Sequence, residues 1–174
     1  MIVVPIVAVV IGVIVVSSSI YSSEINQYGV LGSAHVHSAF AIKLNGIALD
    51  FSKPEFQVQS RLIHVEGGDG NTLHRHTDKV PFGEFLRSVD MGIDRECFFM
   101  NNGAREGEQK FCNSNDSKLR VFANGQELED PQSISDYVFK DNDRILVIYG
   151  NETSSEMENE LDVLRRVPIQ RIQN

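Results

Sequence analysis

The first part of the chain is almost uniformly apolar. Residues 2–16 are apolar, Pro or Gly, and no Asp, Glu, Lys or Arg occurs before Glu24. With residues 17–21 the uncharged stretch reaches about 20 residues, roughly what a helix needs to cross a hydrocarbon core. The pattern predicts a retained transmembrane anchor over residues 1–22. A cleaved signal peptide, which would lack its usual basic start, and a buried core helix are the alternatives.

Alternating apolar and polar positions after a short linker, residues 23–33, predict a strand-rich domain over residues 34–150. Asn45-Gly46 separates two apolar runs and predicts a hairpin, because a type I′ turn needs positive φ at both central residues. Asn124-Gly125 predicts a second such turn. Further strands are expected at residues 47–51, 62–66, 73–76, 97–100, 110–112, 118–123, 137–139 and 144–149.

Two segments have helical spacing. Phe82, Phe85, Leu86 and Val89 recur at i, i+3, i+4 and i+7 and predict one internal helix. Its expected limits are Pro81 at the first helical position and Gly92 just after the end.

A second helix is expected in the C-terminal segment, residues 151–174. Thr153 and Glu156 have capping-box spacing, and Pro168 is expected to stop the helix. Its apolar stripe, Met157, Leu161 and Leu164, either packs on the domain itself or docks on a partner or a membrane surface.

The order hairpin, helix, strands predicts an α+β fold. It resembles a β-grasp arrangement, in which a mixed sheet holds one packed helix, here with a cysteine-closed hairpin and a C-terminal helix added. A resemblance at this level carries no information about activity.

Charge and cysteines bear on location. The net charge of −8 argues against nucleic-acid binding, which needs a basic face. Cys97 and Cys112 flank a Gly- and Asn-containing segment and predict a disulfide formed in an oxidising compartment, with two reduced buried thiols as the alternative. Asn115 and Asn151 begin glycosylation sequons. These features predict a single-pass cell-membrane protein whose C-terminal domain lies outside the cytoplasm.

All five histidines lie within residues 35–76: His35, His37, His64, His74 and His76. Residues i and i+2 of a strand point to the same face, so each His-x-His pair can present two imidazoles together. Histidine ligands without thiolate favour Cu(II), Zn or Ni over Cu(I), so copper or zinc is the expected ion. Glu66, Asp69 and Asp78 are available as additional ligands or as acceptors that orient the imidazoles. Exposed or core-polar histidines and a pH-sensing cluster are the alternatives.

Motifs for catalysis are missing from the sequence. It contains no Gly-x-Ser-x-Gly, no phosphate-binding Gly-x-x-x-x-Gly-Lys and no Cys-x-x-Cys. The chain is therefore expected not to be an enzyme. The enzymatic alternative is a His-bound metal that activates water or dioxygen, with Glu66 or Asp78 as the base.

Three stretches carry a family resemblance: His-Val-His-Ser-Ala-Phe at residues 35–40, Leu-Asn-Gly at 44–46, and Ile-His-Val-Glu-Gly-Gly-Asp-Gly-Asn-Thr-Leu-His-Arg-His at 63–76. They resemble small membrane-anchored, His-rich extracytoplasmic proteins of ammonia-oxidising archaea, and the similarity extends over residues 34–160. Arg75 stands where members of that family often carry a smaller residue.

The resemblance implies a location and a metal-ligand set and leaves the reaction open. Those archaea rely on copper enzymes at the cell surface, so the expected function is a membrane-anchored metal-binding module that delivers or buffers copper. The alternative is a non-catalytic accessory subunit of a membrane complex such as ammonia monooxygenase. The lipid membrane and a membrane protein are the expected partners.

Overall fold

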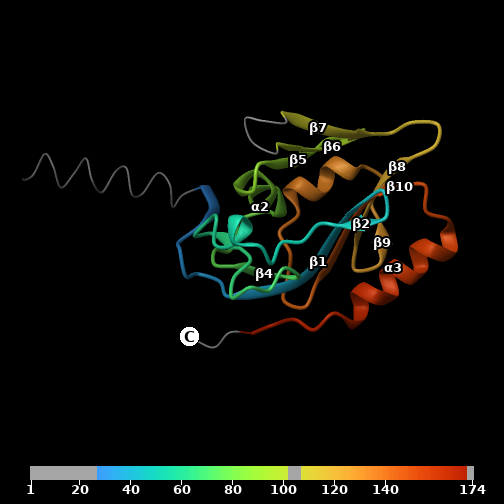
Figure 1. Ribbon diagram of the computed structural model, residues 1–174. Helices are drawn as coiled ribbons and strands as arrows, with labels where there is room; N and C mark the ends of the chain where they lie inside the picture. The colour runs from blue at the N-terminus through green and yellow to red at the C-terminus, as the bar shows by residue number, and fades with distance from the viewer. Residues whose placement is uncertain (1–26, 102–106, 172–174) are drawn as a thin grey trace, which may run out of the picture.

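The fold is mixed α+β and rich in strands. The computed structural model describes residues 27–101 and 107–171. Its main sheet has the strand order β3-β4-β1-β10-β8-β9, and β2 pairs with β1 (Figure 1). The strands are β1 (Val36–Leu44), β2 (Ile47–Ala48), β3 (Ile63–His64), β4 (Thr72–Arg75), β8 (Lys118–Ala123), β9 (Gln126–Glu127) and β10 (Arg144–Gly150).

Strands β1 and β10 form the centre of this sheet and are parallel to each other. Their pairing begins at Ala39 opposite Arg144 and ends at Leu44 opposite Tyr149. The N-terminal part of β1, from Val36 to Ala39, pairs with β4 in antiparallel register. Strand β1 therefore pairs with β4 along one edge up to Ala39 and with β10 along the other edge from Ala39 onward.

The two faces of the sheet bury different sets of side chains. Phe40 and Ile42 of β1 enter the larger core, together with the helix α2 (Phe82–Ser88). Ala39 belongs to a smaller core beneath the helix α3 (Ser154–Arg166). Figure 1 shows α2 and α3 on opposite sides of the sheet. Because side chains alternate along a strand, odd-numbered residues of β1 face α3.

Helix α3 has the start and the packing that the sequence predicts. Thr153 and Glu156 form the reciprocal capping box, and the helix ends at Arg166, two residues before Pro168. Met157, Leu161 and Leu164 are buried on the chain's own sheet. The apolar stripe thus packs on the domain itself, which was one of the two alternatives for this helix.

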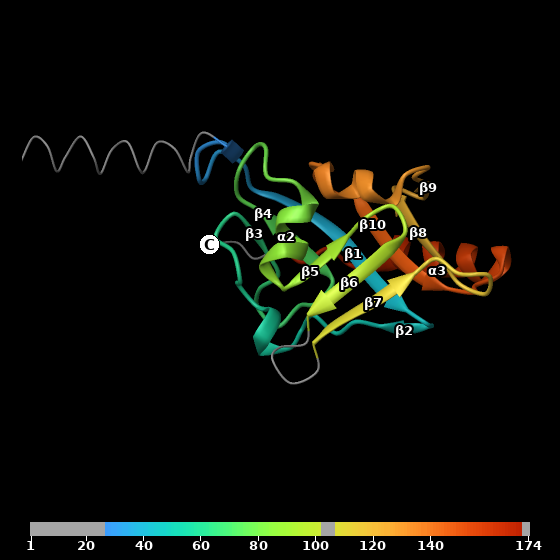
Figure 2. The same cartoon turned by 90° about the horizontal axis from the view of Figure 1, so that it is seen from above.

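A three-stranded antiparallel sheet lies over the larger core. It consists of β5 (Met91–Ile93), β6 (Cys97–Asn101) and β7 (Glu108–Cys112), and it crosses over β1 in Figure 2. The predicted disulfide is confirmed, because Cys97 and Cys112 are directly opposite each other and bonded. The hydroxyl of Tyr149 in β10 donates to the carbonyl of Cys112 at 3.0 Å and so links the two sheets.

Both Asn-Gly turns are confirmed. Asn45 and Gly46 have φ of 52° and 79°, and Asn124 and Gly125 have φ of 54° and 81°. Positive φ at both central residues is the property that favours Asn-Gly at these turns.

Three predicted boundaries are wrong. Residues 137–139 are not a strand, since they follow a short 3-10 helix, Pro131–Asp136. Pro81 precedes the first helical residue of α2 as its N-cap. Gly92 lies inside β5, where an added Cβ would come within 2.2 Å of the ring of Phe99, so cross-strand packing rather than helix termination requires glycine there.

Several predicted strands are also shorter than their apolar runs. Residues 47–51 and 62–66 pair as strands only at Ile47–Ala48 and Ile63–His64.

Residues 27–101 and 107–171 contain no helix that is both long enough and apolar enough to cross a membrane. The predicted anchor, residues 1–22, lies outside these ranges.

The disulfide closes a separation of 15 residues. We expect Cys97→Ser/Cys112→Ser to lower the free energy of unfolding by about 3 kcal/mol, because the open chain gains conformational entropy when unfolded. Denaturant unfolding of the full chain measures this, and wild-type protein treated with a reductant serves as the matched comparison. Equal transition midpoints for the oxidised wild type and the double variant would contradict the expectation.

Candidate metal site

The histidines lie on or directly beside the same end of the main sheet, on the face that α3 covers further along. The register places His37 of β1 opposite His74 of β4, and His74 opposite His64 of β3. These three side chains therefore form a row across three neighbouring strands. His76 follows β4 and has the same parity as His74.

His35 precedes β1 and has the parity of His37, so all five imidazoles meet on one face. Their rings form a closed circuit in which each ring has at least two neighbours. The distances between ring centroids are 4.8 Å for His35–His37, 4.7 Å for His37–His74, 6.0 Å for His74–His64, 4.9 Å for His64–His76 and 5.3 Å for His76–His35. The two His-x-His pairs thus come together in the fold.

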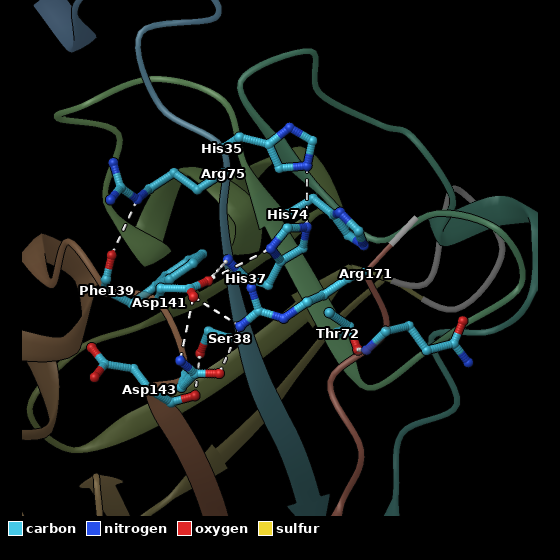
Figure 3. A network of polar contacts seen from close by, with 12 residues as sticks. His35, His37, Ser38, Thr72, His74, Arg75, Phe139, Asp141, Asp143 and Arg171 are labelled. Atoms are coloured by element: carbon cyan, nitrogen blue, oxygen red, sulfur yellow. Dashed lines mark hydrogen bonds and ion pairs between the residues drawn. The ribbon is translucent and has the colours of Figure 1, made fainter. Parts of the chain in front are cut away.

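Three of these residues, His35, His37 and His74, have ligand atoms that all lie within 4.8 Å of one another. The Nε2 atoms of His35 and His37 are 3.2 Å apart (Figure 3). Two nitrogens bound to one tetrahedral zinc, at about 2.0 Å each, are separated by about 3.3 Å. The group could therefore hold a metal ion after small rotations of the side chains.

Burial leaves several imidazole nitrogens without a hydrogen-bond partner. His74 is fully buried, and neither its Nδ1 nor its Nε2 is hydrogen-bonded. Nδ1 of His37 and Nε2 of His64 are also buried and lack hydrogen-bond partners. A buried polar atom without a partner costs about 1–3 kcal/mol, and a metal ion would satisfy such nitrogens. His35, by contrast, is exposed and lies at the rim.

Asp141 connects the site to the C-terminal tail. Its Oδ1 accepts the backbone N–H of His37 at 3.0 Å and lies 3.6 Å from Nδ1 of the same residue. Its Oδ2 accepts from Arg171 at 2.8 Å (Figure 3). Burial acts to raise the pKa of Asp141, but the hydrogen bonds from Arg171 and His37 outweigh it and lower that pKa. The carboxylate is thus held charged beside His37.

Glu66 and the carbonyl of Ser60 lie on the other side of the circuit. Glu66 places Oε1 at 3.3 Å from Nδ1 of His74 and Oε2 at 3.4 Å from Nε2 of His64. Nδ1 of His64 is 2.6 Å from the Ser60 carbonyl oxygen. A carbonyl oxygen only accepts, so Nδ1 of His64 carries the hydrogen and donates it.

The two other acidic candidates have different surroundings. Asp69 accepts from the backbone of Asn71 at 2.8 Å within the glycine-rich turn. Asp78 is exposed. Neither belongs to the convergent donor group found among residues 27–101 and 107–171.

Arg75 does not interrupt the histidine cluster, although it stands between His74 and His76 in sequence. Its side chain has the opposite parity and donates to the backbone carbonyl of Phe139 on the larger core's side of the sheet (Figure 3). It also donates to the backbone carbonyl of Thr77.

Sequence reasoning missed Asp141, Ser60 and Arg171. Asp141 lies between the strands predicted at residues 137–139 and 144–149, and no local pattern relates it to residues about a hundred positions earlier. Ser60 contributes its backbone carbonyl, a group that every residue has, so its residue type gives no signal. Arg171 stands in the tail beyond the predicted helix stop. Only the pairing of distant strands brings these groups to the histidines.

Burial lowers the pKa of three histidines. It is the main cause for His74, whose pKa falls to about 4 even though Glu66 opposes the shift. It is also the main cause for His37, where His35 adds to the lowering, and for His76, where His64 adds to it. Imidazoles that stay neutral keep the lone pair that a metal needs.

Comparisons of the chain with protein-family models, curated proteins and solved structures find no match. The sequons Asn115 and Asn151 are exposed on the surface of the domain. Their glycosylation, like the family resemblance, stays a prediction.

We expect the metal-free protein to lose stability as the pH falls from 6.5 towards 4. In that range an unfolded chain protonates its histidines, whereas His74 of the folded protein protonates only near pH 4. The unfolded state then binds more protons, so acid favours it, by on the order of 3 kcal/mol for His74 alone.

Denaturant unfolding across this pH range, with EDTA present, measures the slope. His74→Gln, which removes the titrating group, is expected to have a flatter dependence. Parallel pH profiles for the wild type and this variant would contradict the assignment.

Proposed function

We propose that the protein is a metal-binding module that holds a copper or zinc ion through His35, His37 and His74. The observation that carries this is the convergence of imidazole nitrogens on one sheet face, with four nitrogens of His37, His64 and His74 buried and without hydrogen-bond partners. Such nitrogens are costly unless something binds them. An ion is the simplest species that binds several at once.

The donor set narrows the choice of ion. It consists of imidazole nitrogens, while both cysteines are in the disulfide. Without thiolate, Cu(II), Zn or Ni is favoured over Cu(I). His35 is exposed, so one ligand stands at the surface where an ion enters or leaves. This access supports delivery or buffering of the ion rather than a purely structural site.

The proposed location is the outer face of a cell membrane, with residues 1–22 as the anchor. Support comes from the apolar N-terminal sequence and from the disulfide, which is typical of oxidising compartments. The resemblance to anchored extracytoplasmic proteins points the same way. A β-grasp-like description of the domain is part of the same proposal, supported by the parallel pairing of β1 with β10 beneath α2.

The full-length protein is expected to stay in the membrane fraction after an alkaline wash, because an apolar helix partitions into lipid. A variant lacking residues 2–22 provides the comparison and is expected to be released. Protease added outside intact cells is expected to remove an epitope placed at the C-terminus. Release of the full-length protein by the wash, or protection of the epitope, would contradict the proposed location.

The accessory-subunit alternative depends on an unoccupied docking surface. The apolar stripe of α3 was the candidate for one, but Met157, Leu161 and Leu164 pack within the domain. We therefore place metal binding first. An enzymatic role has no support beyond the ligand set itself.

The test of metal binding compares the wild type with His35→Gln/His37→Gln. Titration of the metal-free full chain with Zn²⁺ or Cu²⁺, without a histidine tag, is expected to show the variant binding one ion fewer per chain. At 100 times Kd, a bound ion adds about 2.7 kcal/mol to the stability of the wild type, and the variant is expected to lose this gain.

Gln109→Ala/Lys110→Ala, on the exposed edge strand β7, is the control and is expected to bind like the wild type. Unchanged stoichiometry and affinity in the histidine variant would contradict the proposed function.

A further inference from the structure

The imidazole circuit contains more donors than one ion uses. A tetrahedral zinc takes four ligands, whereas the circuit offers five imidazoles and the carboxylate of Glu66. Once His35, His37 and His74 are assigned to one ion, His64, His76 and Glu66 remain.

The contact between His64 and Glu66 has no hydrogen to share if the imidazole is neutral. Nδ1 of His64 carries the hydrogen, because it lies 2.6 Å from the carbonyl oxygen of Ser60. Nε2 then has only a lone pair, yet it lies 3.4 Å from the carboxylate Oε2 of Glu66 and is buried without a partner. Two electron-rich atoms at this distance repel each other, and a metal ion bound by both would remove that repulsion.

The other contacts of Glu66 favour a metal ion. Its second oxygen, Oε1, lies 3.3 Å from Nδ1 of His74. If that nitrogen donates to the carboxylate, the Nε2 of His74 stays available for the first ion, and Glu66 sets its tautomer. His76 supplies a third side chain, since its ring centroid is 4.9 Å from that of His64.

We propose that the cluster binds two metal ions, the second held by His64, Glu66 and His76. This rests on the proposed function, because both ions share one circuit of imidazoles. Glu66 joins the two positions: one oxygen binds the second ion and the other orients His74 toward the first. The second set combines two imidazoles with one carboxylate, which suits Zn²⁺ or another divalent ion of intermediate softness.

The inference is tested by counting ions on metal-free full-length protein that carries no histidine tag. The protein is incubated with excess Zn²⁺, separated from free ion by gel filtration and analysed by plasma mass spectrometry. We expect two Zn²⁺ per chain for the wild type. Glu66→Gln and, separately, His64→Gln are each expected to bind one, and His35→Gln/His37→Gln is also expected to bind one.

Glu129→Gln removes an exposed carboxylate elsewhere and is the matched control, expected to bind two ions. Circular dichroism of each variant establishes that it is folded before its ions are counted.

The outcomes separate this inference from the proposed function. One ion in the wild type, lost only in His35→Gln/His37→Gln, would overturn the second site and leave the proposed function standing. Two ions in both the wild type and Glu66→Gln would overturn the role of Glu66. No bound ion in the wild type would overturn both proposals.

Discussion

The domain depends on the offset between the two pairings of β1, which has β4 on one edge and β10 on the other. From Ala39 to Leu44 it lies beside β10 in the parallel pair at the centre of the sheet. Before Ala39 it extends past the start of β10 and pairs with β4. The C-terminal half of β1 therefore builds the core, and its N-terminal end presents His37 beside the loop that leads into β10.

That loop continues along the edge of β1 where β10 has not yet begun, and it hydrogen-bonds to the backbone of His37 there. The backbone of Asn142 donates to the carbonyl of His37 at 2.8 Å, and Asp141 accepts from its N–H. The backbone of β1 is thus fully hydrogen-bonded at His37, and its imidazole is held at a fixed place. The C-terminal tail adds a further tie, because Gln170 donates to Thr72 on the same face as His74. Residues distant in sequence thereby hold the ligands in a rigid setting, which metal affinity requires.

Much of the fold could be predicted from local patterns. Asn45-Gly46 and Thr153 with Glu156 specify their turns and caps through near neighbours, and strand parity placed His35 with His37 and His74 with His76. The register that sets His37 opposite His74 and His64 comes from pairing between separate strands, so no local pattern shows it. The same is true of Asp141 and of Gly92, whose requirement for glycine arises from the ring of Phe99 on the neighbouring strand.

The central claim is that these buried imidazoles exist to bind metal. The most direct measurement is the metal content of the protein extracted from its native membrane in mild detergent, without an affinity tag, by plasma mass spectrometry. The account predicts at least one copper or zinc per chain. A folded, metal-free protein that also takes up no copper or zinc when these ions are added would contradict it.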